Sequence, residues 1–294
     1  MAAPKVAQAA GSILLPVGLL LIAIASIQSG ASLAKTLFPA IGAQGTVALR
    51  VLFAAILLML IFRPWRVRLT TVGLRSVIVY GIALGCMNLT FYMALRTVPL
   101  GVAVALEFTG PLAVALFGSR RPTDFLWVGL AVAGLLLLLP VGGFAAGIDP
   151  VGAAYALTAG VCWALYILFG QKAGAVHGMQ TAAWGSLIAA IVVLPIGIHH
   201  AGTALLDPAI LPVALTVAVL STALPYSLEM MALTRLPTRT FGTLMSVEPA
   251  FAALSGLLFM GEMLTPLQWT AIGAIICASV GTTATARRAP ASAG

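Results

Sequence analysis

Apolar stretches of about 20 residues alternate with short polar segments along almost the whole chain. A helix needs about 20 apolar residues to cross the hydrocarbon core of a bilayer. Dividing the chain on that length predicts ten membrane-spanning helices, near residues 13–34, 46–62, 74–95, 99–118, 124–141, 150–170, 180–199, 209–233, 239–260 and 265–286. The pattern therefore predicts an all-α integral membrane protein.

Composition excludes the soluble classes. Hydrophobic residues make up 61% of the 294 residues and charged residues 7%, with a mean hydropathy of +1.12, whereas soluble chains are about one quarter charged. The net charge of +8 comes from basic residues in short loops, so we expect a lipid bilayer and no nucleic acid as partner. Cys86, Cys162 and Cys277 lie in separate apolar stretches without ligand-like spacing, so no disulfide, metal site or cofactor is predicted.

Basic residues predict the orientation, because Lys and Arg are enriched in cytoplasmic loops. With the N-terminus in the cytoplasm, that side holds Lys5, Arg63, Arg66, Arg68, Arg75, Arg120, Arg121, Lys172, Arg235, Arg239, Arg287 and Arg288. The other side holds only Lys35 and Arg96. Arg50 lies inside a predicted helix near its outer end, where a long side chain can reach the interface. The imbalance predicts that both termini are cytoplasmic.

The two halves of the chain share a sequence pattern. The tripeptide Met-Ala-Leu, followed four residues later by Pro, starts at Met93 and again at Met231, and Pro111 recurs as Pro249 at the same offset. Each half, 1–145 and 146–294, then holds five helices, and an odd number inverts the second half in the membrane. Inverted repeats are typical of secondary transporters, whose substrate site lies near the midplane.

Glu107 lies about half way along a predicted helix, where a charged side chain costs several kcal/mol. Pro111, four residues later, has no N–H for the Glu107 carbonyl. Both groups must therefore face protein or water. One interpretation is a translocation site, and the alternative is a helix-packing role.

Glu248 in the second half is expected to approach Glu107, since its repeat equivalent is Gly110, on nearly the same helix face as Glu107. Such a pair could bind the ammonium of a substrate or exchange protons, so both acids are candidates for proton coupling. The prolines predicted to interrupt helices are Pro99, Pro111, Pro225, Pro237 and Pro249.

Further polar and aromatic positions predict a cavity between helices of both halves. Asn88 and Tyr92 are i, i+4 neighbours, Tyr226 and Glu229 follow on the equivalent helix, and Ser26 and Ser29 correspond to Trp163 and Tyr166. Each could instead form an ordinary interhelical contact, and Glu229 is equally explained by an interfacial ion pair with Arg235. Gly81 and Gly85 form a GxxxG motif, which favours close helix packing.

Three stretches, VALEFTGPLAVALF, LSTALPYSLEMMALTRLPTRTFGTLMSVEPA and IASIQSGASLAKTLFP, resemble the EamA family of the drug/metabolite transporter superfamily. The resemblance extends over essentially the whole chain. It implies ten helices in two inverted EamA repeats, a bacterial inner-membrane location and a central cavity shared by the halves. It also implies efflux of small amino acids such as threonine and homoserine.

Other functions remain as alternatives. Related exporters carry cysteine derivatives, aromatic amino acids or cationic compounds. An intramembrane hydrolase would need a nucleophile and a base at membrane depth, but His177, His199 and His200 all lie at loops or helix ends, so we expect no enzyme. A channel is disfavoured by inverted halves with proline-broken helices, which indicate alternating access.

Overall fold

The computed structural model describes residues 4–66, 71–117, 122–138, 148–178, 180–226, 228, 245 and 247–286, and within these ranges the chain is helical without β-strands. The α-helices are α1 (Pro4–Lys35), α2 (Phe38–Phe62), α3 (Thr71–Ala94), α4 (Leu100–Glu107), α5 (Thr109–Phe117), α6 (Pro122–Leu138), α7 (Pro150–His177), α8 (Gln180–Ala201), α9 (Ile210–Ala218), α12 (Glu248–Met260) and α13 (Pro266–Ala286). The described residues also form two 3₁₀ turns, η1 (Pro64–Arg66) and η2 (Gly202–Leu206), and one π-helix, η3 (Val219–Ala223).

Five of the described segments are long and apolar enough to cross a membrane: Val17–Lys35, Phe38–Phe62, Gly73–Ala94, Pro150–His177 and Gln180–Leu206. Shorter apolar helices cover Leu100–Val114, Ile210–Tyr226, Glu248–Met260 and Pro266–Ala278. In hydrocarbon, backbone N–H and C=O groups must pair within the segment, and helices achieve this. The chain is therefore an all-helical membrane protein, as its hydropathy predicts.

α2 is longer than predicted. It starts at Phe38 rather than near residue 46, and Gly42 interrupts it with φ 69° and ψ 172°. Glycine adopts this backbone because it has no Cβ, and a Cβ would also collide with the His200 ring. The early start moves Arg50 at least two turns away from the beginning of the helix.

The predicted span 99–118 is broken in its middle. α4 ends at Glu107, Phe108 forms a turn, and α5 starts at Thr109. The break packs against α7 through glycines: Gly110 lies on the carbonyl oxygen of Gly160, and Gly160 lies on the carbonyl of Glu107. A Cβ at either glycine would collide with that backbone.

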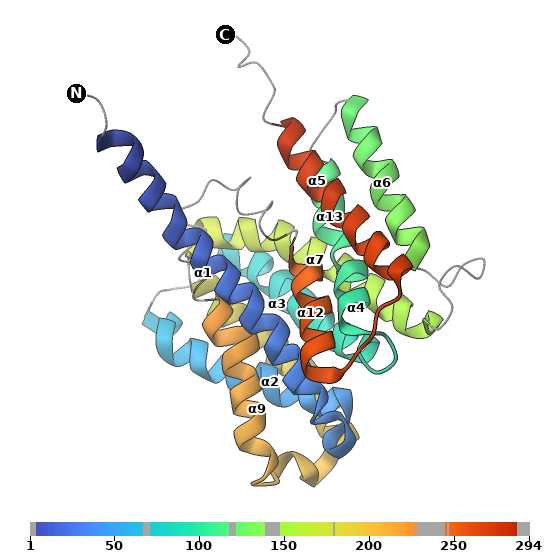
Figure 1. The fold of residues 1–294 in the computed structure, drawn as a ribbon. Helices are drawn as coiled ribbons and strands as arrows, with labels where there is room; N and C mark the ends of the chain where they lie inside the picture. The colour runs from blue at the N-terminus through green and yellow to red at the C-terminus, as the bar shows by residue number, and fades with distance from the viewer. Residues whose placement is uncertain are drawn as a thin grey trace.

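Helices from the two halves of the chain pack on one another. α2 packs on α8, α4 on α12, and α6 on α13, the last two visible side by side in Figure 1. α3 packs on α7, and α1 packs on η3, α9 and α12. Gly81 and Gly85 face Ile188 and Ala189 of α8, so the GxxxG motif is a close packing contact. The first turn of α1 and the last turn of α13 lie at the same end of the molecule (Figure 1).

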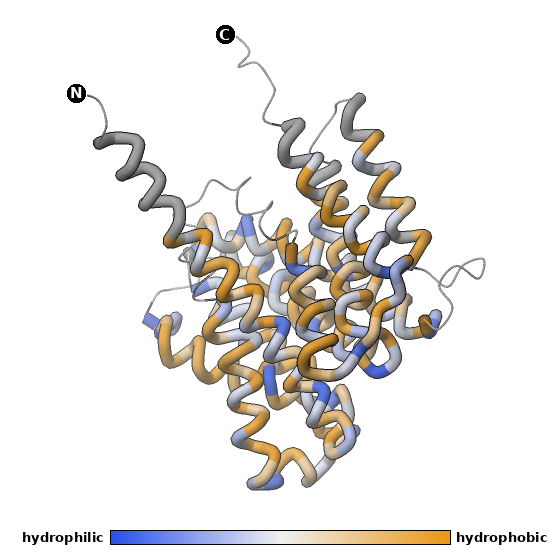
Figure 2. Tube along the Cα trace, viewed as in Figure 1, coloured by the Kyte–Doolittle hydropathy of each residue, from blue (hydrophilic) through white to orange (hydrophobic). Residues whose placement is uncertain are grey.

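Hydrophobic side chains cover the outward faces of the helices. Leu258 is 74% exposed, Leu126 66% and Phe259 65%. Figure 2 shows apolar positions along most of the helices, with hydrophilic ones scattered between them. Exposed apolar surface on this scale is rare on a soluble monomer and suits contact with lipid tails.

Candidate functional site

Glu107 is the last residue of α4 and is 7% exposed. Its carbonyl has no partner four residues later, because Pro111 has no N–H. Its carboxylate forms no hydrogen bond or ion pair with the described part of the chain, which leaves its acceptor positions open. An interior carboxylate without partners is costly, so the side chain is suited to a ligand, a proton or water.

Glu248 is the first residue of α12 and is 5% exposed. The amide Nε2 of Gln28, in α1, donates a hydrogen bond of 2.9 Å to its Oε1, while its Oε2 is buried without a partner among the described residues. The N-terminus of a helix favours a carboxylate at this place. Glu107 interacts electrostatically with Glu248, and α4 packs on α12, so the fold places the two acids near each other.

Arg50 does not reach the membrane interface as its position in the sequence predicts. It is 7% exposed rather than extended to the interface, and its guanidinium carbon lies 4.8 Å from the ring centroid of Tyr92. The early start of α2 places Arg50 too far inside for its side chain to reach the helix end. Arg50 interacts electrostatically with both Glu107 and Tyr92.

Tyr92 is completely buried, and its hydroxyl lies near Ser221 without a well-aligned hydrogen bond. Ser221 belongs to the π-helix η3, in which the Leu224 N–H bonds to the Val219 carbonyl. Pro225 follows and cannot donate to the Ser221 carbonyl, which favours the wider turn. π-turns of this kind are frequent at functional sites.

These residues form what we term the central cluster: Gln28, Arg50, Tyr92, Glu107 and Glu248. Four of them, Gln28, Arg50, Tyr92 and Glu107, come from the first half of the chain, and Glu248 comes from the second. Sequence reasoning missed Gln28, although a glutamine in an apolar helix, one turn before the buried Ser32, is a usable signal.

Several predicted site residues have other partners. Ser26 donates to the Leu220 carbonyl at 2.6 Å, and Asn88 donates to the Leu84 carbonyl of its own helix at 2.7 Å. Tyr166 stacks on Tyr80 with centroids 4.8 Å apart. For these three residues the structure shows ordinary contacts within or between helices, which is the alternative to a role in lining the cavity.

The remaining predicted positions are placed as follows. Trp163 packs edge-on against Phe108, next to Glu107, while Ser29 and Tyr226 are half-buried. Pro99 is the N-cap of α4, and Pro249 is the second residue of α12. Glu229 and Pro237 lie outside the described residues.

A second polar group lies at helix ends. Lys35, at the end of α1, forms an ion pair with Glu262 in the segment between α12 and α13. The other carboxylate oxygen of Glu262 accepts from the Leu100 N–H at 2.7 Å, at the start of α4. Glu262 thereby ties three elements together and caps a helix.

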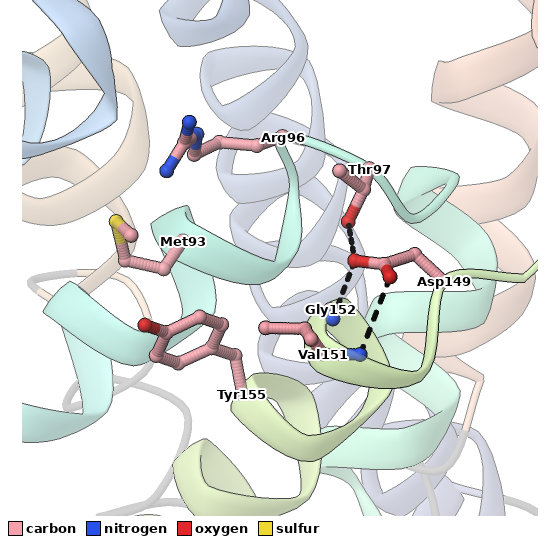
Figure 3. A pocket seen from close by; sticks show the side chains of 7 residues that line it. All are labelled: Met93, Arg96, Thr97, Asp149, Val151, Gly152 and Tyr155. Carbon is pink, nitrogen blue, oxygen red and sulfur yellow. Dashed lines mark hydrogen bonds between the residues drawn. The ribbon is translucent and has the colours of Figure 1, made fainter.

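Nearby, a cavity of about 220 Å³ lies between the ends of α3 and α7 (Figure 3). Asp149 caps α7 and accepts from the Thr97 hydroxyl at 2.8 Å and the Gly152 N–H at 2.9 Å. These hydrogen bonds hold the pKa of the Asp149 carboxyl below its usual value, and the bond from Thr97 has the largest effect. Arg96 extends away from Asp149 in Figure 3. We group Lys35, Thr97, Leu100, Asp149 and Glu262 as the terminal cluster.

An apolar helical chain with unpaired ionisable groups in its interior belongs to the class of polytopic membrane transporters. Comparison with known proteins makes this specific. The model of the EamA-like transporter family matches residues 150–284. The threonine/homoserine exporter RhtA of Escherichia coli (strain K12) is 60% identical over 93% of this chain and 93% of its own length. The exporter of the same name from Salmonella typhimurium (strain LT2) is 62% identical over 94% of both chains.

More distant matches agree. The uncharacterized transporter YwfM of Bacillus subtilis (strain 168) is 28% identical over 65% of this chain and 67% of its own. A crystal structure whose description names no function superposes with a TM-score of 0.62, covering 96% of this chain and 99% of the other at 18% identity, which shows the fold. The chain belongs to the EamA-like transporter family, and it is a transporter rather than an enzyme.

Proposed function

We propose that this protein exports threonine, homoserine and related small amino acids across the bacterial inner membrane. The observation that carries the proposal is the 60–62% identity over more than nine tenths of the chain to exporters named for these two substrates. One basic and two acidic side chains lie in the interior, Arg50 with Glu107 and Glu248, and this combination suits a zwitterionic substrate.

The proposed architecture is ten membrane helices in two inverted repeats, 1–145 and 146–294. Helix pairing supports it. In this scheme α2 and α8, α4 and α12, and α6 and α13 are repeat equivalents, and each packs on its own equivalent. In the same scheme α3 is equivalent to α9–η3, and α7 is equivalent to α1. α3 packs on α7, and the symmetry-equivalent pair, α9–η3 and α1, also packs together. A pseudo-two-fold axis produces this pattern.

Both termini are proposed to be cytoplasmic. The distribution of Lys and Arg supports this orientation. The common position of the first turn of α1 and the last turn of α13 supports an even number of crossings (Figure 1). Single cysteines near Gly147 and Thr203 should react with an impermeant reagent from outside, and tags at both ends should not. A C-terminal tag accessible from outside would remove the ten-helix topology.

The proposed mechanism is alternating access around the central cluster. A carboxylate of Glu107 or Glu248 holds the substrate ammonium. Export against a gradient needs an energy source, and an interior glutamate can carry a proton inward when the substrate leaves. Proton antiport is therefore the proposed form of coupling.

Reconstituted vesicles test the function. The purified protein should transport threonine and homoserine with saturation and counterflow. Transport should be faster when protons move down their gradient in the direction opposite to the substrate. A panel of cysteine derivatives, aromatic amino acids and cationic compounds serves as comparison. Absence of saturable threonine and homoserine flux would refute the substrate assignment, and flux insensitive to a pH gradient would refute the coupling.

A further inference from the structure

Arg50 is an unusual arginine for this chain. Among the lysines and arginines whose side chains the structure describes, it alone is buried. Its Nε is enclosed without a hydrogen-bond partner, and no hydrogen bond or ion pair joins its guanidinium to any described residue. A buried guanidinium presents five N–H donors, and leaving them unpaired is costly.

The contact of this guanidinium with Tyr92 does not use its hydrogen-bond donors. The guanidinium carbon lies over the Tyr92 ring, 4.8 Å from the ring centroid, which is a cation–π contact. The N–H groups have no acceptor among the described residues and are therefore available to a ligand. A planar edge of N–H donors matches a carboxylate, which can accept two parallel hydrogen bonds.

The acids whose side chains the structure describes do not pair with this guanidinium. Glu107 interacts with Arg50 electrostatically but forms no ion pair with it within 4.0 Å. Glu248 is engaged by Gln28 instead. The central cluster therefore places a guanidinium and a carboxyl group near each other, neither with a hydrogen-bond or ion-pair partner among the described residues, and this arrangement suits a zwitterion.

We propose that Arg50 binds the α-carboxylate of the transported amino acid, while the acids of the central cluster bind its ammonium. This inference rests on the proposed function, because it assumes an amino-acid substrate. It assigns to Arg50 recognition of the one group that all α-amino acids share and that their amino alcohols lack. Tyr92 acts as a positioning residue through its cation–π contact with the guanidinium.

The experiment compares threonine with threoninol, which keeps the ammonium and both side-chain carbons with the hydroxyl but has no carboxylate. Each is tested as an inhibitor of labelled threonine counterflow in vesicles and as a ligand that raises the melting temperature of the purified protein. The wild-type protein should bind threonine about 100-fold more tightly than threoninol, since a buried charge pair is lost. Equal binding of the two compounds by the wild-type protein would overturn the proposal.

The variants Arg50→Gln and Arg50→Lys identify the residue responsible. Arg50→Gln should weaken the binding of threonine about 100-fold and change the affinity for threoninol less than about threefold, so that the protein no longer discriminates between the two compounds. Arg50→Lys should restore part of it, because an ammonium keeps the charge without the bidentate geometry. Arg75→Gln is the matched control: it removes an exposed arginine of α3 and should leave both affinities unchanged.

The outcomes separate the two proposals. If Arg50→Gln weakens threonine and threoninol equally, Arg50 has only a structural role and the inference is wrong, whatever the substrate. If the wild-type protein carries another amino acid instead of threonine, the same ratio is measured with that amino acid and its amino alcohol. If it carries no amino acid, the proposed function fails and the inference fails with it. Should Arg50→Gln not insert, Arg50→Lys and the wild-type comparison still decide.

Discussion

The two polar clusters of this protein differ in how their charges are satisfied. In the terminal cluster Glu262 has both carboxylate oxygens engaged, one by Lys35 and the other by the Leu100 N–H. In the central cluster Arg50 and Glu107 have no hydrogen-bond or ion-pair partner among the described residues. Both clusters join elements distant in the sequence, yet only the first uses its polar groups fully for the fold.

This difference is the reason for proposing the central cluster, and not the terminal cluster, as the binding site. A group that caps a helix or completes an ion pair gains most from staying where it is. An unpaired interior charge destabilises the resting protein, and an apolar residue of similar size would be better for stability alone. In the proposed mechanism a substrate or a proton pairs with these groups, so variants of the central cluster should affect transport more than folding.

The largest expected effect follows from neutralising an acid of the central cluster. Glu107→Gln keeps the size and can still accept hydrogen bonds, but it neither titrates nor carries charge. We expect the initial rate of uphill export to fall about 100-fold, because the proposed charge-assisted contact and the proposed proton carrier are both lost. Export rates at several pH values, with Glu248→Gln in parallel and membrane levels as control, measure this. A fully active Glu107→Gln protein with an unaltered pH profile would leave helix packing as its role.

A medium effect, on stability rather than on export, is expected in the terminal cluster. Glu262→Ala removes the partner of Lys35 and leaves the Leu100 N–H without an acceptor, which should cost about 1–3 kcal/mol. Glu262→Gln keeps an oxygen for Leu100 and should lose less. Thermal unfolding in detergent measures both. A loss of threonine export without a loss of stability would show that this cluster takes part in transport, and the contrast between the clusters would be wrong.

The smallest effect is expected at Asp149, which lies at the surface. Its hydrogen bonds from Thr97, Gly152 and Val151 lower the pKa of its carboxyl in the folded protein. A lowered pKa means that the stabilisation is fully present above the unfolded pKa and is lost as the pH falls through the folded pKa. Asp149→Ala should therefore lower the melting temperature slightly at about pH 7, and by progressively less as the pH falls through the lowered pKa of the folded protein. A deficit that grows toward acidic pH would contradict the capping role.

Much of the fold could be predicted from the sequence for one physical reason. Lipid gives each residue an environment that depends on depth, so a run of apolar residues is sufficient to indicate a helix across the bilayer. The same reasoning singled out Glu107 and Glu248, because a carboxylate within an apolar run is costly at any rotation of the helix. The proline that frees the Glu107 carbonyl was also readable from its spacing alone.

Helix ends and partners required the tertiary structure. The apolar pattern started the second helix near residue 46, whereas packing on α8 and the kink at Gly42 extend it to Phe38. That shift turned Arg50 from a residue near the interface into a buried one. A hydropathy pattern predicts the depth of a segment in the membrane, but it does not predict irregular backbone at a helix end.

By itself, then, the sequence determined that this protein is a helical membrane protein, where its interior acids lie along the chain, and to which family it bears resemblance. Only the tertiary structure decided which groups meet: Gln28 with Glu248, Arg50 with Tyr92, and Lys35 with Glu262. The physical reason is that depth follows from local composition, whereas a contact across some 220 residues depends on which helix faces lie together. That arrangement leaves Arg50 and Glu107 without a hydrogen-bond or ion-pair partner in the described part of the chain, and no local sequence pattern could have indicated it.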